Sequence, residues 1–243
     1  MRTVVISQPM FFPWVGMFEQ LRLADVYLHY DDVQYSKGSF TNRVQVKTAQ
    51  GSRWLTVPLR QLKLGQPIME VRIDDATDWR AQHLALLEKA YAAAPRFADM
   101  MSLAREVYEE RHETISDLSI ASMNAVLRYF SFDHPKEIHW SSRTPLPSSS
   151  SERVLAYVLH FRGDRYITGH GARNYLDHEL FERQGVQVEY MNYLKRPYPQ
   201  LHGEFTPFVS VLDLIANCGK SGVSMFSSGT IPWRQMLSSH ESH

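Results

Sequence analysis

A short segment near the N-terminus combines side chains that can bind and activate a polar substrate. It comprises Asp31-Asp32-Val33-Gln34-Tyr35-Ser36-Lys37 and Thr41-Asn42-Arg43. Such a group could hold a sugar ring, and Arg43 with Lys37 could clamp a phosphate or carboxylate. The alternative is a solvated loop whose charges pair with one another. Adjacent carboxylates point to opposite sides of an extended chain, so Asp31 and Asp32 predict no metal chelate.

A second cluster follows the first apolar stretch of the chain. It consists of Gln8-Pro9-Met10-Phe11-Phe12-Pro13-Trp14-Val15-Gly16. Gln8 offers a hydrogen-bond donor and an acceptor, and aromatic rings such as that of Trp14 can form a pocket wall. Open parallel sheets bind ligands outside the carboxyl ends of their strands, where this cluster is expected. Its aromatic rings could instead fill the core around a rigid turn.

Two histidines are candidates for site residues. His83 shares one helical stripe with Trp79 and Leu87, so it faces either the core or a pocket cut into the core. A core histidine would bond to backbone groups, whereas a pocket histidine would be a general base. His170 lies between two glycines, which let the backbone approach a ligand closely, although their spacing is not that of a phosphate-binding loop.

The second half contains a polar loop, a lone cysteine and a C-terminal segment that bear on the site. Pro197-Tyr198-Pro199-Gln200 is a stiff polar loop that could close a pocket through Tyr198 and Gln200, or merely cross the surface. The lone Cys218 has no predicted charged neighbour that would activate its thiol, so we expect it to be structural. Residues 227–234 could form a flexible C-terminal tail.

Short apolar strands that alternate with helices must position these residues. We predict strands at 4–6, 25–30, 70–73, 137–140, 166–168 and 186–190, and a hairpin joining 40–47 to 53–59. We predict helices at 13–23, 79–91, 100–108, 115–130, 153–161, 174–184 and 209–216, the second of them capped by Asp78. The pattern predicts an α/β fold, with a mainly parallel layered sheet, helices on its faces, an antiparallel hairpin addition and a helical middle region. We expect a single domain over 1–243, in which 79–132 could stand as a helical lobe.

Composition restricts the class of partner. The 26 basic residues balance the 26 acidic ones, so no overall field attracts nucleic acid or an anionic membrane. The single cysteine can form no intrachain disulfide, the N-terminus shows no secretory signal, and no stretch has the length of a membrane span. We therefore expect a cytoplasmic protein. Walker, HExxH and nucleophile-elbow patterns are missing from the sequence, so we predict no metal site and no cofactor.

A series of short motifs follows in order along the chain. They are Gln8-Pro-x-x-Phe12-Pro13-Trp14-x-Gly16, Ala24-Asp25, Asp31-Asp32-Val33-Gln34-Tyr35-x-Lys37, Asn42-Arg43, Trp54-Leu55-Thr56-Val57-Pro58, Trp79-x-x-x-His83, Tyr166-x-x-Gly169, Tyr175-Leu176, Pro197-x-Pro-Gln200 and Phe205-x-Pro207-x-x-Ser210-x-x-Asp213-Leu214. In these motifs the chain resembles the WbqC-like family. Met10-Phe11 departs from a pattern that prefers tyrosine, and residues from Lys220 onward look like a private extension. The family is associated with gene clusters for O-antigen and related surface glycans. The resemblance thus implies an enzyme of surface-polysaccharide or related metabolite biosynthesis.

Our function hypothesis is a metal-independent group transferase that forms an amide by acyl or aminoacyl transfer to an activated sugar. A general base, an anion clamp and an oriented amide side chain would suffice for such chemistry. We assign catalysis to His83, Lys37 and Asp32, and substrate binding to Gln8, Trp14, Asp31, Gln34, Tyr35, Asn42, Arg43, His170, Tyr198 and Gln200. The expected partners are small molecules, namely a nucleotide sugar and an acyl or aminoacyl donor.

Two other function classes compete with this hypothesis. The first strand, its turn and the following helix have the outline of class I nucleotidylyltransferases, but the histidines of their first motif are absent. The other class is a non-catalytic assembly or binding protein. It predicts a large exposed apolar patch, whereas the enzyme hypotheses predict a polar pocket in which Gln8, Asp32 and Lys37 converge with Asn42 and Arg43.

Overall fold

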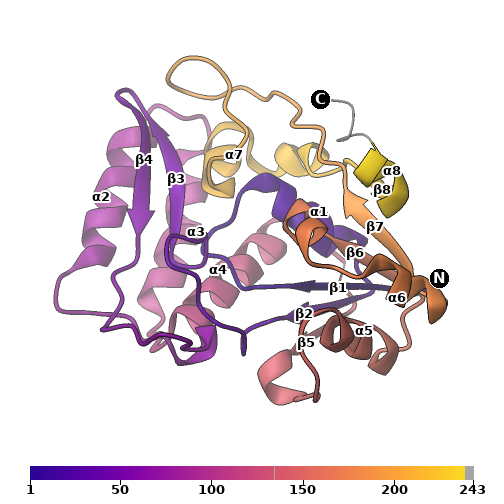
Figure 1. The fold of residues 1–243 in the computed structure, drawn as a ribbon. Helices are drawn as coiled ribbons and strands as arrows, with labels where there is room; N and C mark the ends of the chain where they lie inside the picture. Colours follow the sequence, from indigo (N-terminus) through magenta and orange to yellow (C-terminus); the bar gives the residue numbers. More distant parts are fainter. Residues whose placement is uncertain (134, 239–243) are drawn as a thin grey trace.

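A six-stranded sheet forms the centre of the molecule. The computed structural model describes residues 1–133 and 135–238 (Figure 1). The strands of the large sheet, in spatial order, are β5 (Glu137–Trp140), β2 (Val26–His29), β1 (Thr3–Ser7), β6 (Arg165–Thr168), β7 (Gln187–Met191) and β8 (Thr230–Pro232). All pairs are parallel except β7 with β8. The hairpin β3 (Arg43–Thr48) and β4 (Gly51–Thr56) forms a separate antiparallel sheet.

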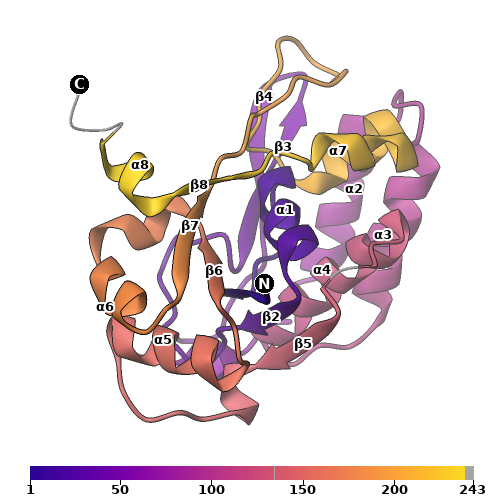
Figure 2. The ribbon, with the colours of Figure 1, turned by 90° about the vertical axis from the view of Figure 1, so that its right-hand side faces the viewer.

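Helices cover both faces of the large sheet, as the alternating pattern predicted. They are α1 (Val15–Leu23), α2 (Trp79–Tyr91), α3 (Phe97–Glu109), α4 (Ile115–Phe130), α5 (Ser150–His160), α6 (His178–Arg183), α7 (Val211–Cys218) and α8 (Trp233–Ser238). Short 3-10 helices are η1 (Ile68–Glu70), η2 (Ser141–Arg143), η3 (His170–Asn174) and η4 (Gly219–Met225). Figure 2 shows α5 and α6 on one side of the sheet, and α1 with the α2–α4 group on the other. The α/β prediction, with its mainly parallel sheet, hairpin and helical middle region, is confirmed.

Side-chain alternation along the strands supplies two hydrophobic cores. Val4 and Ile6 of β1 pack with α5 and α6, whereas Val5 packs with α1, α4 and α7. These residues are all buried, which explains why the strand is a continuous apolar run rather than an alternating one. A single buried strand thus contributes to the cores on both faces.

Chain connectivity places a topological switch point between β1 and β6. The chain leaves β1 through α1 to reach β2 on one side, and it leaves β6 through α6 to reach β7 on the other. In sheets of this type the crevice outside the carboxyl ends of the strands binds ligands. The residues that follow β1, β2, β5 and β6 therefore line the edge where a functional site is expected.

The loop between β1 and α1 is strained and firmly held. Phe12 is fully buried with a φ of 37°, an unusual backbone conformation for an aromatic residue. The Ser122 hydroxyl accepts a hydrogen bond from the Phe12 N–H at 2.9 Å, and the Ser210 hydroxyl donates to the Phe12 carbonyl at 2.8 Å. Helices α4 and α7 therefore stabilise the backbone of the turn that carries the Phe12-Pro13-Trp14 motif.

Three segments differ from the sequence prediction. The strand predicted at 70–73 is wrong, because this segment forms η1 and two isolated bridges, Leu59 with Ile73 and Arg72 with Thr114. The helix predicted at 174–184 is shorter. It begins after Asp177, whose side chain accepts a hydrogen bond from the Leu180 N–H. Part of the suggested flexible tail instead forms β8 and α8, because β8 pairs with the otherwise open edge of β7.

The described helices are too short or too polar to span a membrane. Within residues 1–133 and 135–238, no helix combines the length and apolar character needed to cross a bilayer.

We predict that Gly16→Ala lowers the free energy of unfolding by about 1–3 kcal/mol, the usual cost of overpacking. A methyl group at Gly16 would lie 2.1 Å from ring atoms of Trp14, whose ring packs edge-on against Tyr193 and Phe208. The control is Gly171→Ala, where no atom lies within 4 Å of the added methyl group. It should change stability by less than about 0.5 kcal/mol in urea denaturation. An equal effect of both variants would contradict the packing explanation.

Candidate functional site

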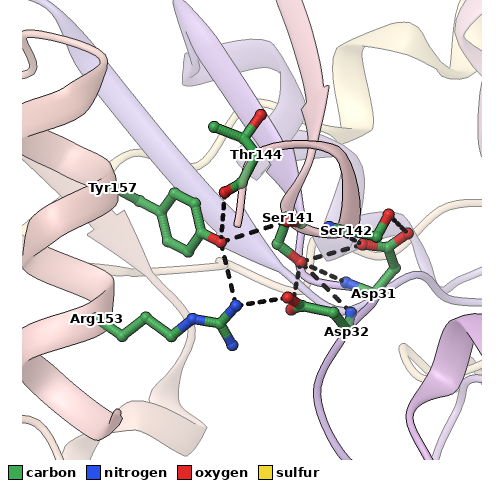
Figure 3. A network of polar contacts seen from close by, with 7 residues as sticks. All are labelled: Asp31, Asp32, Ser141, Ser142, Thr144, Arg153 and Tyr157. Carbon is green, nitrogen blue, oxygen red and sulfur yellow. Dashed lines mark hydrogen bonds and ion pairs between the residues drawn. The ribbon is translucent and has the colours of Figure 1, made fainter. Parts of the chain in front are cut away.

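Two adjacent carboxylates follow β2 and meet two adjacent serines that follow β5 (Figure 3). The strands pair in parallel with His29 opposite Trp140, so Asp31 and Asp32 reach the sheet edge beside Ser141 and Ser142. Asp31 and Ser141 are buried, whereas Asp32 is partly exposed. Segments 110 residues apart in sequence thus form one polar group at the carboxyl edge, with Asp31 at its base.

Serine hydroxyl and backbone N–H groups hold both carboxylates by hydrogen bonds. Asp31 accepts bonds from the Ser142 N–H at 3.0 Å and from the Ser142 hydroxyl at 2.7 Å. The Ser141 Oγ accepts bonds from the N–H groups of Asp31 and Asp32, and it lies 2.6 Å from Asp32 Oδ1 and 3.0 Å from Asp31 Oδ1. Because a hydroxyl has one proton to donate, the shorter contact identifies Asp32 as its acceptor. Ser141 thereby fixes both acidic residues.

Arg153 from the first turn of α5 pairs with the second oxygen of Asp32. Its Nη2 donates to Asp32 Oδ2 and lies 3.2 Å from the hydroxyl oxygen of Tyr157. The Tyr157 hydroxyl in turn donates to the Thr144 carbonyl at 3.0 Å. Burial alone would lower the pKa of Arg153, but the hydrogen bond to Asp32 and the charge interactions with Tyr30, Asp32 and Tyr157 together outweigh burial and raise that pKa above its ordinary value. Arg153 is therefore a permanent cation beside Asp32.

Part of the Arg153 hydrogen-bonding capacity is unused. Its Nε is buried and has no hydrogen-bond partner among the described residues. The start of α5 is also open, because the N-cap residue Ser149 makes no side-chain capping bond. Free N–H groups and the positive end of a helix dipole favour an anion. The carboxyl edge thus offers a cation and open helix N–H groups beside a fixed carboxylate.

Gln8 and His170 follow the two strands of the switch point. Gln8 comes directly after β1, is partly buried, and makes no hydrogen bond within the described part of the chain. His170 comes two residues after β6, and its Nε2 lies 2.6 Å from the carbonyl of Met191. The structure thus brings Gln8, Asp31, Asp32 and His170 to one edge of the sheet.

The other residues of the first polar segment lie around the hairpin. The Tyr35 hydroxyl donates to Asn42 Oδ1 at 2.8 Å, and Asn42 Nδ2 donates to the Val57 carbonyl at 2.9 Å. Arg43 donates to the Gly38 carbonyl and stacks on Trp54, with 4.3 Å from its Cζ to the ring centre. Gln34 and Lys37 are exposed. Among the described residues, no hydrogen bond or ion pair joins this set to Asp32 or Gln8.

His83 is buried and both of its ring nitrogens are engaged. Its Nε2 lies 3.1 Å from the Thr56 carbonyl, which can only accept, so Nε2 carries the proton. Its Nδ1 then accepts from the Tyr108 hydroxyl at 3.0 Å. Burial lowers the pKa of His83 to about 4. A neutral ring with both nitrogens bonded has the geometry expected of a structural core histidine rather than of a general base in a pocket.

Tyr198 and Gln200 belong to a buried polar group that fastens the long loop before α7. Tyr198 and Tyr91 both donate to Asp213, at 3.0 and 2.9 Å, and burial raises the pKa of that carboxyl. Lys47 Nζ donates to Gln200 Oε1 at 3.1 Å and also bonds to two loop carbonyls. This arrangement holds the loop against β3 and α7. Trp14, which bridges to Ser210 at the start of α7, packs beside the same loop.

The residues that complete the carboxyl-edge group were missing from our sequence assignment. They are Ser141, Ser142, Arg153 and Tyr157. The available signal was positional, since Ser141 and Ser142 follow a predicted strand directly, and Arg153 begins a predicted helix. Across residues 1–133 and 135–238, no group of three His, Cys, Asp or Glu side chains is arranged to hold a metal ion.

Comparison with known proteins gives two matches. The model of the WbqC-like protein family matches residues 8–225. The Mycobacterium tuberculosis (strain ATCC 25618 / H37Rv) protein described as "Uncharacterized protein Rv1507c" is 35% identical over 222 residues, which cover 90% of this chain and 95% of that protein. No solved structure matches the chain.

We predict that Ser141→Ala destabilises the protein by about 1–3 kcal/mol, because it leaves buried polar groups of Asp31 and Asp32 without their partner. Ser36→Ala removes an exposed hydroxyl and should cost less than about 0.5 kcal/mol. Urea denaturation measures both changes. Similar stability of the two variants would show that the Ser141 bridge is unimportant for the fold.

We also predict that His83 makes stability depend on pH. The pKa of His83 is about 4 in the folded state, below the ordinary value of 6.5, so its contribution is complete above pH 6.5 and is lost as pH falls towards 4. The stability advantage of the parent over His83→Gln should therefore shrink by up to about 3 kcal/mol across this window. His160→Gln, at an exposed position, is the control. A constant difference would refute a neutral buried His83.

Proposed function

The chain belongs to the WbqC-like protein family, and on this premise we propose that it is a transferase of surface-polysaccharide biosynthesis that acts on an activated sugar. The observation that carries the proposal is the pairing of Asp32 with Arg153 at the carboxyl edge of β2 and β5. Asp32 is a fixed acceptor, and Arg153 keeps unused donors beside an open helix start. A sugar linked to phosphate needs both kinds of group.

We assign the phosphate of the activated sugar to Arg153 and the N-terminus of α5. Charged guanidinium donors and the free N–H groups of a helix N-terminus both bind phosphate favourably. The sugar would then extend towards Gln8, whose amide is partly buried and makes no hydrogen bond within the described residues. Tyr30, whose ring lies 5.3 Å from Arg153 Cζ, would form an aromatic wall of the same site.

The reaction we propose is transfer of an acyl or aminoacyl group to an amino group of the sugar. The amine nitrogen forms a bond to the acyl carbon, and the bond from that carbon to the leaving group of the donor breaks. The amine proton passes to Asp32, whose carboxylate retains free lone pairs besides those bonded to Ser141 and Arg153. Ser141 holds Asp32 in place as a positioning residue, because it donates to the carboxylate and accepts from the Asp32 N–H.

A nucleotidyl-transfer reaction is the second candidate, and the strand order favours it. Counted along the chain, the order β5-β2-β1-β6-β7-β8 corresponds to the 3-2-1-4-5-6 order of doubly wound nucleotide-binding sheets. The usual phosphate position at the start of α1 is closed, however, because the Trp14 ring covers Gly16. A nucleotide would have to bind through α5 instead, which keeps Arg153 central to both candidates.

We predict that a nucleotide sugar raises the melting temperature of the parent protein, in a panel that also contains ATP and acyl-CoA species. Arg153→Gln should remove most of this shift, since it removes the cation that binds phosphate. Arg183→Gln on α6 replaces an exposed arginine and should retain the shift. Binding should also weaken as salt rises. A shift that survives in Arg153→Gln would place the ligand elsewhere.

For Asp32, we predict that Asp32→Asn keeps the ligand-induced stabilisation but lowers turnover by about 10²–10⁴-fold, the usual contribution of a general base. Turnover would be measured with the donor and acceptor that the stabilisation panel identifies. Asp164→Asn, an exposed carboxylate at the opposite end of β6, is the matched control and should turn over like the parent. Parent-like turnover of Asp32→Asn would exclude Asp32 as the base.

A further inference from the structure

A cavity of about 530 Å³ lies between α3, α4 and the end of β5. This volume is within the range that holds a small metabolite. The cavity is lined on one side by a stripe of α4, on another by the end of α3 and the turn after it, and on the third by Trp140 and Arg143. Trp140 and Arg143 flank Ser141 and Ser142, so the same short segment also contributes to the carboxyl-edge group.

Two ion pairs neutralise some of the charges around the cavity. Arg128 pairs with Glu106 at 2.5 Å, and Glu113 pairs with Arg72 at 3.2 Å. Asp117 accepts the Thr114 hydroxyl bond at 2.7 Å as part of the α4 cap, and this neutral partner leaves the carboxylate charge in place. The binding preference of the cavity therefore depends on the charged groups that remain.

The charged groups without a charged partner balance one another. Arg111 and Arg143 form no ion pair within the described part of the chain. The acids without an arginine partner are Asp117 and Glu110, and the Glu110 side chain is 72% exposed. Two unpaired arginines thus face two carboxylates, so any preference of the cavity for an anion depends on how its individual side chains are arranged.

Arg143 is arranged as an anion receptor. Its guanidinium stacks on the Trp140 ring, with 4.3 Å from Cζ to the ring centre. Stacking occupies the face of the guanidinium and leaves its N–H donors free at the edge, which is the geometry for bidentate binding of phosphate or carboxylate. A ligand would therefore contact guanidinium N–H groups that the stack on Trp140 already holds in position.

His112 supplies a second, independent observation. Its side chain lines the cavity and is only 7% exposed, yet its Nε2 has no hydrogen-bond partner among the described residues. The nearest acidic oxygen, Glu110 Oε2, is 3.9 Å away and too distant for a hydrogen bond. A buried polar atom without a partner is costly unless a ligand or water completes it. Asn124 on α4 offers a further amide donor nearby.

We propose that this cavity is a binding site for a small anionic metabolite, which Arg143 holds through its phosphate or carboxylate group and His112 and Asn124 orient. The site is separate from the pair of Asp32 and Arg153. It lies on the α4 side of the sheet, whereas Arg153 comes from α5 on the other side. The proposal therefore stands or fails independently of the proposed reaction.

The test follows the Trp140 indole N–H by NMR while the full-length protein is titrated with sodium phosphate or sodium malonate at constant ionic strength. Trp140→Phe identifies this signal among those of the five tryptophans. We expect a saturable shift with at least one probe, and the tighter one distinguishes phosphate from carboxylate recognition. Arg143→Gln should weaken binding by about 10-fold or more, because it removes a charge-assisted fork. His112→Gln should weaken it while the Arg143 stack on Trp140 remains.

Two controls make the result specific. Arg105→Gln replaces an exposed arginine on α3 outside the cavity and should bind like the parent. Arg153→Gln should also leave the Trp140 shift unchanged, which separates this site from the carboxyl edge. The proposal is overturned if neither probe gives a saturable shift, if Arg143→Gln binds like the parent, or if Arg153→Gln alone removes the shift.

Discussion

The arrangement of the carboxyl edge depends on one hydroxyl group, that of Ser141. It accepts hydrogen bonds from two consecutive backbone N–H groups after β2 and donates to the Asp32 carboxylate. A buried turn of this kind cannot leave its N–H groups unpaired, so the position of the β5 end determines that of Asp31 and Asp32. Arg153 can then reach Asp32 from α5, the helix that follows β5 in the chain. The connection from β5 through α5 to β6 therefore produces both the topological switch point and the polar group.

The family motifs divide into residues at this edge and residues that hold loops in place. Asn42 joins Tyr35 to the Val57 carbonyl, and Asp213 joins Tyr91 to Tyr198. Gly16 is required by the ring of Trp14 above it. These residues are polar or unusual because buried loops need internal hydrogen bonds and close packing. Polar character alone therefore could not distinguish them from residues that contact a substrate.

Local sequence patterns predicted most of the helices and strands. The features that these patterns missed depend on contacts between residues far apart in the sequence. Buried strands such as β1 and caps such as Asp78 depend on neighbouring residues, so their sequence signals were sufficient. The 70–73 segment was mistaken for a strand because Arg72 and Ile73 form isolated bridges rather than a continuous ladder. Asp31 and Asp32 were selected as candidate site residues from their types and position. Ser141 and Arg153 were not, since they approach Asp32 from 109 and 121 residues away.

In the proposed function, Asp32 and Arg153 form the substrate site. The most direct measurement is a crystal structure of the protein with the nucleotide sugar that stabilises it most. The account predicts a phosphate oxygen within hydrogen-bond distance of Arg153 Nε, the donor that now lacks a partner among the described residues, and a sugar group beside Asp32. A nucleotide sugar bound away from this edge, with the Arg153 Nε still unpaired, would contradict it.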